Sequence, residues 1–131
     1  SNSYDRLRLL GYALSEKMKV LPEYRTAYIF LSRAELSRFN FRNGDTEGLV
    51  NYCLSIDGIR FAAFFMEREG TIKASFRSKG DFDVNLFART HFNGGGHRNA
   101  AGGDAKGQTL EQAEKQFLEL LPKYKDALNG K

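Results

Sequence analysis

The sequence contains a single cysteine, Cys53, among its 131 residues. One thiol cannot build the disulfide framework that stabilises many small secreted domains. The apolar neighbours of Cys53 instead predict a small residue of the core. No stretch is long and apolar enough to predict a membrane span, and none resembles the hydrophobic region of a secretory signal. These absences lead us to expect a cytoplasmic protein.

Several signatures of catalysis are also missing. The sequence has no GxxxxGK[ST] phosphate-binding loop, and its glycines do not follow the GxGxxG spacing of dinucleotide-binding turns. Neither a nucleophile elbow nor a Ser/His/Asp set can be recognised. Its two histidines, His91 and His97, and its one cysteine belong to different predicted elements. Because a metal centre needs three or four converging ligands, we expect no metal site in this chain.

The composition is that of one globular domain, since 41% of the residues are hydrophobic and 11 Phe and 6 Tyr can fill a core. The net charge of +4 favours anionic partners, although the 16 acidic residues among the 20 basic ones fit an ordinary basic surface equally well. Ser1 and Asn2, with no initiator methionine, resemble the remnant of a removed purification tag. We therefore expect residues 3–131 to form a single domain taken from a longer protein.

Hydrophobic residues at steps of three and four predict helices over residues 4–18, 47–54, 83–92 and 110–128. A capping box at Ser32 and Glu35 predicts a further short helix. Runs of strand type lie between these helices in the sequence, so the helices can cover both faces of a sheet formed by those strands. The order of helices and strands indicates an α/β protein, or α+β by stricter usage, with a mixed sheet covered by helices.

Short apolar and aromatic runs predict the strands. The run Arg25–Leu31 is one, and Ile59–Glu67 followed by a turn and Thr71–Ser78 is typical of a β-hairpin. The first hairpin strand is nearly all apolar, which predicts a central strand buried on both faces, whereas the second alternates and should keep one polar face. The small residues of "NAAGGDA" could form one more short strand.

Glycine makes up five of the thirteen residues from His91 to Gly103. Glycine loses much backbone freedom on folding, so such a series needs a reason, either a tight turn with positive φ or a close approach of the backbone to another surface. The N–H groups of Gly94–Gly96 could turn inward and form a nest for phosphate. His97 could then donate to the same anion, with Arg98 beside it. An ordinary turn followed by a surface histidine is the alternative.

A second candidate site is "SFRSKGD", at the end of the polar-faced strand. Arg77 could grip a phosphate with two parallel hydrogen bonds, while Ser78 adds a hydroxyl and Lys79 a point charge. A solvated strand end would explain the same residues. A third candidate, "DTEGLVNY", contains Thr46, which could instead cap a helix.

These residues carry a resemblance. The segment "GGGHRNAAGG" resembles the GGGH-xx-A-AG signature of the DHHA1 domain, which is the C-terminal half of DHH-family phosphoesterases. The segments "DTEGLVNYCLSIDGIRFAAFF" and "IKASFRSKGDFDVNLFA" resemble those that precede it in short-oligonucleotide ribonucleases and adenosine 3',5'-bisphosphate phosphatases. The likeness runs from about Ser3 to Leu128, and its order of elements agrees with the one predicted above.

The resemblance implies a DHHA1-like fold in which the glycine loop and its histidine contact phosphate, and the Arg and Ser of the "RS" element help to grip the nucleotide. The matching residues are Gly94, Gly95, Gly96, His97, Arg77 and Ser78. Arg98 and Asn99 fall in the variable part of the signature. In that family the catalytic metals, usually manganese, are held by Asp and His residues of an N-terminal DHH domain, which this sequence does not contain. We therefore expect the chain alone to hydrolyse nothing.

Two functions of different kinds fit the sequence. The first is the substrate-binding domain of a manganese-dependent phosphoesterase, with the DHH domain of the same chain as its partner and short RNA, DNA or nucleotide phosphates as ligands. The second is an RNA- or tRNA-binding module, because DHHA1-like domains also occur in alanyl-tRNA synthetases. Under the first function, oligoribonucleotides, bisphosphate nucleotides, cyclic dinucleotides and polyphosphate all remain possible substrates.

Overall fold

A six-stranded sheet forms the centre of the protein in a computed structural model that describes residues 2–131. Its strands are β1 (Lys19–Leu21), β2 (Thr26–Leu31), β3 (Phe61–Arg68), β4 (Thr71–Ser78), β5 (Gly95–His97) and β6 (Ala100–Asp104). They lie in the order β1-β2-β3-β4-β6-β5, with β2 and β3 parallel and each other neighbouring pair antiparallel. This mixed sheet confirms the predicted fold class. Ser1, assigned with Asn2 to a tag remnant, lies outside the described residues.

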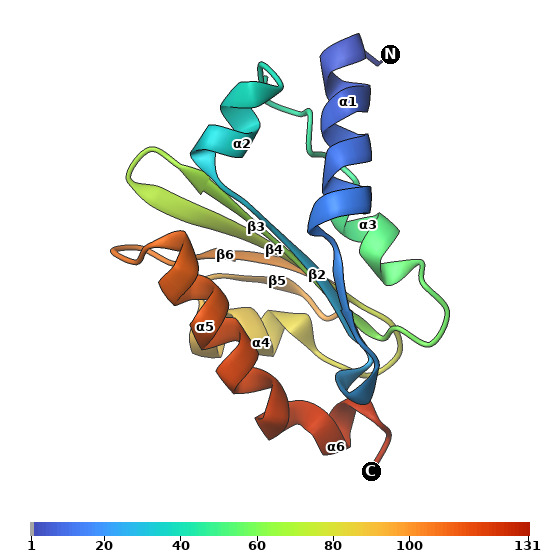
Figure 1. Ribbon diagram of the computed structural model, residues 1–131. Coiled ribbons are helices and arrows are strands. Elements are labelled where there is room, and N and C mark those ends of the chain that lie inside the picture. Colours follow the sequence, from blue (N-terminus) through green and yellow to red (C-terminus); the bar gives the residue numbers. More distant parts are fainter. Residues whose placement is uncertain (1) are drawn as a thin grey trace.

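Helices cover the sheet on both sides. They are α1 (Tyr4–Tyr12), α2 (Arg33–Arg38), α3 (Leu49–Leu54), α4 (Val84–His91), α5 (Leu110–Leu120) and α6 (Lys125–Leu128). Figure 1 shows α1 and α3 on one side and α4, α5 and α6 on the other, while α2 lies beyond the end of β2. Across residues 2–131, no helix has the length and apolar character needed to cross a membrane.

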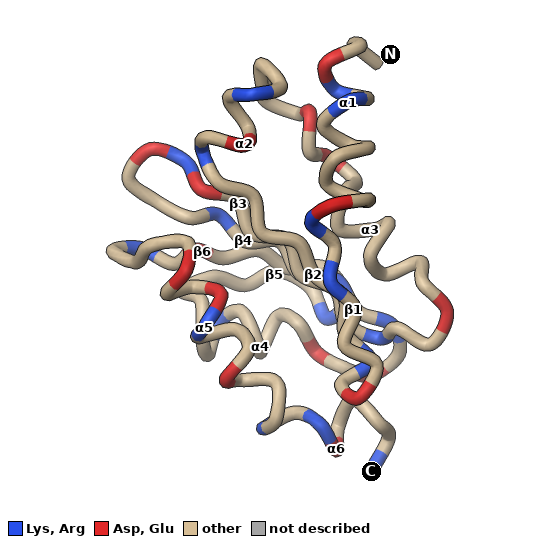
Figure 2. Tube along the Cα trace, in the orientation of Figure 1, with Lys and Arg blue, Asp and Glu red and all other residues tan. Residues whose placement is uncertain are grey.

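Each face of the sheet has its own hydrophobic core, because β3 sends alternate side chains to opposite sides. Phe61 and Phe65 join the core beneath α4 and α5, where their rings pack against Phe117. Ala62 and Phe64 join the core beneath α1 and α3. Figure 2 shows uncharged chain along β2 and most of β3, as two-sided burial requires. The predicted central strand is therefore confirmed.

The next strand, β4, is buried on one face only. Its even-numbered side chains, from Ile72 to Ser78, are buried, whereas its odd-numbered ones, from Thr71 to Arg77, are partly or fully exposed. The residues of β6 that pair with Lys73, Ser75 and Arg77 are not buried either. We call this accessible side of β4, β6 and β5 the open face. It is the predicted polar face of the hairpin.

The local signals for helix starts are also confirmed. Both predicted capping boxes form, with Ser32 bonded to the backbone N–H of Glu35 and Thr109 to that of Gln112. Each pair of bonds satisfies two backbone N–H groups that have no partner within the helix. Cys53 is fully buried, and this burial raises the pKa of its thiol to about 12. The prediction that it is a core residue is therefore confirmed.

The structure departs from the predicted elements at short segments. The first helix changes to a π-helical turn over Ala13–Lys17, and the last is interrupted by a 3₁₀ turn over Leu121–Tyr124. That interruption contains Pro122, which lacks the N–H needed to continue an α-helix. The strands β1 and β5 were not predicted. Each has only three residues, so it depends on pairing with a longer strand rather than on its own pattern.

Candidate functional site

The three consecutive glycines belong to an edge strand. Gly95 pairs with Gly102 of β6 and His97 pairs with Ala100, and the two strands are joined by a two-residue turn. A nest needs successive N–H groups that converge on one point, whereas a strand sends them alternately to two sides. The N–H of Gly94 donates to the Ala88 carbonyl over 3.2 Å. The expected local shape is therefore wrong, although phosphate binding by this segment stays a prediction.

The structure explains why the segment is made of glycine. A Cβ on Gly94 would lie 1.9 Å from the carbonyl oxygen of Gly102, and one on Gly96 would lie 2.7 Å from that of Ala100. Gly95 and Gly96 also have φ angles of +154° and +156°, which side chains disfavour. The close approach that requires glycine is therefore between two strands of the protein itself, since β5 lies too near the backbone of β6 for a side chain to fit.

The start of α4 supports this edge strand. Asp83 caps the helix by accepting a hydrogen bond from the Leu86 N–H over 3.0 Å. Two residues later, the side-chain oxygen of Asn85 accepts the Gly96 N–H over 2.8 Å. Asn85 was not predicted from the sequence, because an amide in the first turn of a helix carries no signal of its distant partner. Asn85 thus ties the glycine strand to the helix that leads into it.

Ser78 and Asn99 anchor the turn that follows His97. Ser78 is only 5% exposed, and its hydroxyl donates to the Phe82 carbonyl over 2.6 Å while accepting from the Asn99 amide over 2.9 Å. The same amide donates to the Gly80 carbonyl over 3.0 Å. In this arrangement the Ser78 hydroxyl points into the protein. Ser78 therefore holds the turn in place, and any direct contact of its hydroxyl with a ligand stays a prediction.

Arg77 lies on the open face, in one row with the glycine segment. It pairs with Ala100 of β6, which in turn pairs with His97 of β5. Since neighbouring strands are about 4.8 Å apart, Arg77 and His97 are separated by about 10 Å of sheet. The next row, Ser75 with Gly102 and Gly95, has only small side chains. Between Arg77 and His97, the open face is therefore lined by residues with small side chains. We call this part of the open face, formed by Ser75, Gly95, Ala100 and Gly102, the floor.

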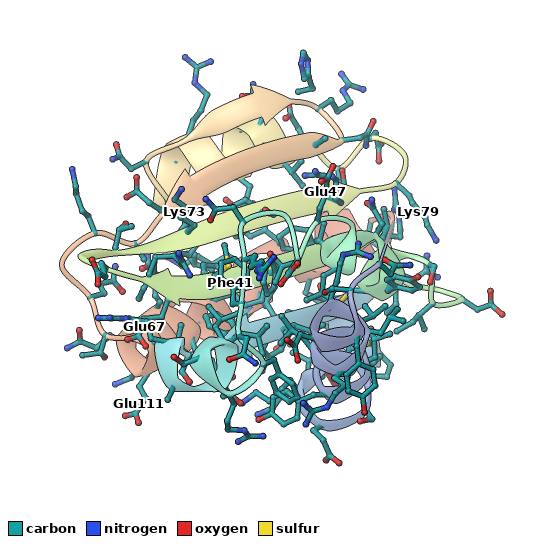
Figure 3. All side chains as sticks on the ribbon, turned by 90° about the horizontal axis from the view of Figure 1, so that it is seen from above. Phe41, Glu47, Glu67, Lys73, Lys79 and Glu111 are labelled. Carbon is teal, nitrogen blue, oxygen red and sulfur yellow. The ribbon has the colours of Figure 1, made fainter. Side chains whose placement is uncertain are left out.

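The cations around this floor form no ion pair within residues 2–131, although Figure 3 shows Glu47 on the same side of the sheet. Within residues 2–131, no carboxylate forms an ion pair with Arg77, whose guanidinium donates to the Phe76 carbonyl over 2.9 Å. The side chains of His97 and Arg98 are exposed beside it. Figure 3 shows Lys79 just past the end of β4. The predicted Arg77, His97 and Arg98 are thus brought to one edge of the molecule with charge available for an anion.

Two other residues of the sequence analysis have structural roles. Thr46 does not cap α3, whose N-cap is Gly48; its hydroxyl instead contacts the sulfur of Met66 at 3.7 Å. His91 lies in α4, with a ring nitrogen 2.5 Å from the Tyr124 hydroxyl. Burial lowers the pKa of His91, and the nearby charge of Lys123 lowers it further. His91 therefore belongs to the packing beneath the sheet, on the side opposite the open face.

Metal ligands do not gather in the part of the chain that the structure describes. Within residues 2–131, no three His, Cys, Asp or Glu side chains form a group that could hold a metal ion. The charged groups near the floor are mainly basic, and cations repel a metal ion rather than bind it. The residues present at this edge therefore fit an anion.

Removing the amide of Asn99 is expected to loosen the turn. Asn99→Ala deletes two hydrogen bonds and leaves buried Ser78 without a donor, so we expect a loss of about 1 to 2 kcal/mol of stability. Asn129→Ala is the matched control, because its amide also makes two bonds to carbonyls, far from the open face. Urea denaturation would compare the stability of the two variants, and amide hydrogen exchange would compare the protection of the turn that follows His97. Faster exchange at His97 in both variants, or in neither, would contradict the anchoring role.

Known proteins share this arrangement. The DHHA1 domain family matches residues 24–125. Two relatives carry the name bifunctional oligoribonuclease and PAP phosphatase NrnA: that of Bacillus subtilis is 38% identical over 82 residues, and that of Thermus thermophilus is 37% identical over 77. These matches cover 63% and 59% of this chain but 26% and 22% of the relatives. The chain therefore spans about a quarter of their length.

A solved structure is similar over almost the whole chain. It is an exopolyphosphatase-related protein from Bacteroides fragilis, 46% identical, and it superposes with a TM-score of 0.93. The match covers 98% of this chain and 37% of that one. The six-stranded arrangement described above thus recurs as one part of a larger protein.

Proposed function

Because this chain belongs to the DHHA1 domain family, we propose that it is the substrate-binding domain of a DHH phosphoesterase. In this proposal it holds the phosphate of a short oligonucleotide or a nucleotide, while an N-terminal DHH domain of the same protein cleaves the phosphoester. The observation that carries the proposal is the row formed by Arg77, Ala100 and His97, where an arginine with no ion-pair partner among residues 2–131 lies beside small residues.

The chemistry of this row suits a terminal phosphate. The guanidinium of Arg77 can donate two parallel hydrogen bonds to a phosphate, which fixes the orientation of the phosphate as well as neutralising charge. His97, from the far strand of the row, can donate a further hydrogen bond. Since Ala100, Gly102 and Gly95 have little or no side chain, the ligand can lie close against the sheet. Donors placed in advance also stabilise charge that develops on phosphoryl oxygens during cleavage.

The names of the relatives support a phosphate ligand without choosing one. Both curated relatives are named as oligoribonucleases and PAP phosphatases, and the solved relative is named as related to exopolyphosphatases. All three names describe the hydrolysis of a bond to phosphate. We propose the ribonucleotide class for this chain, because both curated relatives are named for it, whereas the solved relative, although 46% identical, is named only as related to exopolyphosphatases. The manganese of the proposed enzyme belongs to the DHH domain, so inactivity of this chain alone stays a prediction.

Binding to RNAs of increasing length tests the proposal. Labelled RNAs of two to twenty nucleotides would be titrated with the chain at several salt concentrations, with fluorescence anisotropy as the measurement. We expect weak binding, with a log–log salt slope of about −1 to −2 for a dinucleotide, since one or two phosphates are held. Affinity should stop rising beyond about six nucleotides, a short strand by the standard of strand-tracking proteins. His97→Ala should weaken dinucleotide binding about fivefold, the usual worth of one hydrogen bond.

The opposite result has a clear meaning. Affinity that keeps rising to twenty nucleotides, with a slope of about −4 or steeper, would show a surface that tracks a strand. That outcome would favour an RNA-binding module of the kind found in alanyl-tRNA synthetases. No binding of any RNA, nucleotide or polyphosphate at millimolar concentration would reject the phosphate-binding role altogether.

A further inference from the structure

A large polar cavity lies beside the open face, and the proposed function does not use it. Its volume is about 760 Å³; it is partly open to solvent and is bordered by α2, the loop that follows α2, and the turn between β3 and β4. The lining residues include Arg33, Phe41, Arg42, Arg68, Glu69 and Lys73. Figure 3 shows Phe41 and Lys73 on the side of the sheet that this loop crosses. Ligand sites of small molecules commonly enclose about 300 to 1,000 Å³, so the cavity can hold a nucleotide.

The charge of the cavity favours an anion. Four cations line it, whereas Glu69 is the one carboxylate among its lining residues. Arg33 pairs with Glu69 over 3.2 Å, and both side chains are largely exposed. The other cations, Arg42, Arg68 and Lys73, form no ion pair with any residue from 2 to 131. Figure 2 shows acidic positions next to the basic one at the β3–β4 turn, so the positive charge of the cavity is an excess of basic over acidic groups. An excess of positive charge at one place attracts a polyanion.

The cavity also contains an aromatic surface. The guanidinium carbon of Arg68 lies 4.5 Å from the centre of the Phe41 ring, so the two groups are stacked at the cavity wall. Asn40, Asn43 and Thr71 add amides and a hydroxyl to the same lining. Stacking planes beside hydrogen-bonding groups are what proteins use to hold the bases of single-stranded nucleic acid. A phosphate alone would need only the cations.

The cavity and the row that holds the proposed phosphate lie on the same face of β4. Lys73 and Arg77 are both odd-numbered residues of β4, so both lie on the open face, with Ser75 between them. Four residues of strand span about 13 to 14 Å. A stacked single strand advances about 3.4 Å per nucleotide, so about four nucleotides cover that distance.

We propose that this cavity is a second nucleotide site, which binds the phosphate and base of a short oligonucleotide whose end is held at Arg77 and His97. This proposal rests on the proposed function, because it takes the row at Arg77 as the site of the strand's end. The affinity of the chain for an oligonucleotide then depends on the length of the oligonucleotide. A dinucleotide reaches only the row, while a strand of four to six nucleotides reaches both sites.

The test compares RNAs of two and six nucleotides on the same variants by fluorescence anisotropy. The wild-type chain should bind the hexamer about tenfold more tightly than the dimer. The double variant Arg42→Gln, Arg68→Gln should lose this gain, so that the two affinities become equal, while its dimer affinity stays within twofold of wild type. Phe41→Leu, which keeps every charge, should lose part of the gain. Arg38→Gln is the matched control, because it removes one cation of α2 that does not line the cavity and should keep the gain.

Several outcomes would overturn this proposal. If the hexamer binds no better than the dimer in the wild type, or if the double variant keeps the full gain, the cavity does not take the strand. Because the dimer reports on the row at Arg77 alone, such a result leaves the proposed function standing, whereas loss of dimer binding everywhere rejects both. A polyphosphate of six units that binds as tightly as the hexamer and ignores Phe41→Leu would show an inorganic ligand. Failure of the cavity variants to change the binding of any anion would reject the cavity as an anion site.

Discussion

Gly94→Ala is expected to destabilise the protein by about 3 kcal/mol and to detach β5 from the sheet, which is at the upper end of the cost of overpacking. The added methyl would lie 1.9 Å from the Gly102 carbonyl oxygen and 2.5 Å from the Gly103 Cα. Both atoms are backbone, so no side-chain rotation can relieve the clash. The strand β5 must therefore move away from β6, and His97 moves with it. Binding of a dinucleotide should fall together with stability.

The matched control is Gly11→Ala, because that glycine lies inside α1 with no atom within 4 Å of its added Cβ. Alanine is the better helix former, so this variant should gain about 0.5 to 1 kcal/mol. Urea denaturation of both variants and the wild type gives the two differences. A Gly94→Ala protein of wild-type stability, with unchanged hydrogen exchange in β5, would show that the strands are not packed as described.

Arg77→Ala is expected to weaken dinucleotide binding by about 5- to 150-fold, which corresponds to the 1 to 3 kcal/mol of a charge-assisted hydrogen bond. The effect should be the largest of any single side chain on the open face, since this side chain is half-buried, has no ion-pair partner in the described residues 2–131, and can make two bonds at once. Stability should change little, because the side chain lies outside both hydrophobic cores. Anisotropy titration with thermal denaturation separates the two effects.

Two further variants interpret that result. Arg77→Lys keeps the charge but loses the planar fork, so it should recover only part of the affinity. Lys79→Ala removes an exposed cation just beyond the same strand and should change the affinity less than twofold. If Arg77→Ala and Lys79→Ala weaken binding equally, the contribution is general positive charge rather than a built contact, and the row would lose its proposed role.

Much of the fold could be predicted because its signals are local. The hairpin of β3 and β4 follows from an apolar run, a turn and an alternating run, and both capping boxes follow from pairs of residues three apart. The same reasoning failed at β5, where three glycine-rich residues have no periodicity. A strand of that kind exists only because β6 pairs with it, and β6 is itself too rich in glycine and alanine to predict its neighbour.

The candidate site divides along the same line. The sequence alone predicted the chemistry, since a glycine run followed by His97 and an arginine at a polar strand end indicate an anion site. The tertiary structure decided the geometry. The glycine segment is a strand rather than the predicted nest, and the Ser78 hydroxyl forms hydrogen bonds with Asn99 and Phe82. Strand register places Arg77 and His97 in one row.

Contacts between residues that are distant in the sequence could be found only from the tertiary structure. Asn85 meets Gly96 eleven positions away, and Arg68 meets Phe41 across the sequence of α3 and β3. Composition and spacing report the propensity of a segment, because propensity arises from a residue and its close neighbours in the chain. The strand register, the cavity and the row of Arg77 and His97 all depend on how separate segments pair. A shift of one residue in strand pairing would move every side chain of a strand to the other face of the sheet. The sequence by itself therefore predicted the fold class and the family, and an anionic ligand stays a prediction, while packing decided which residues lie side by side.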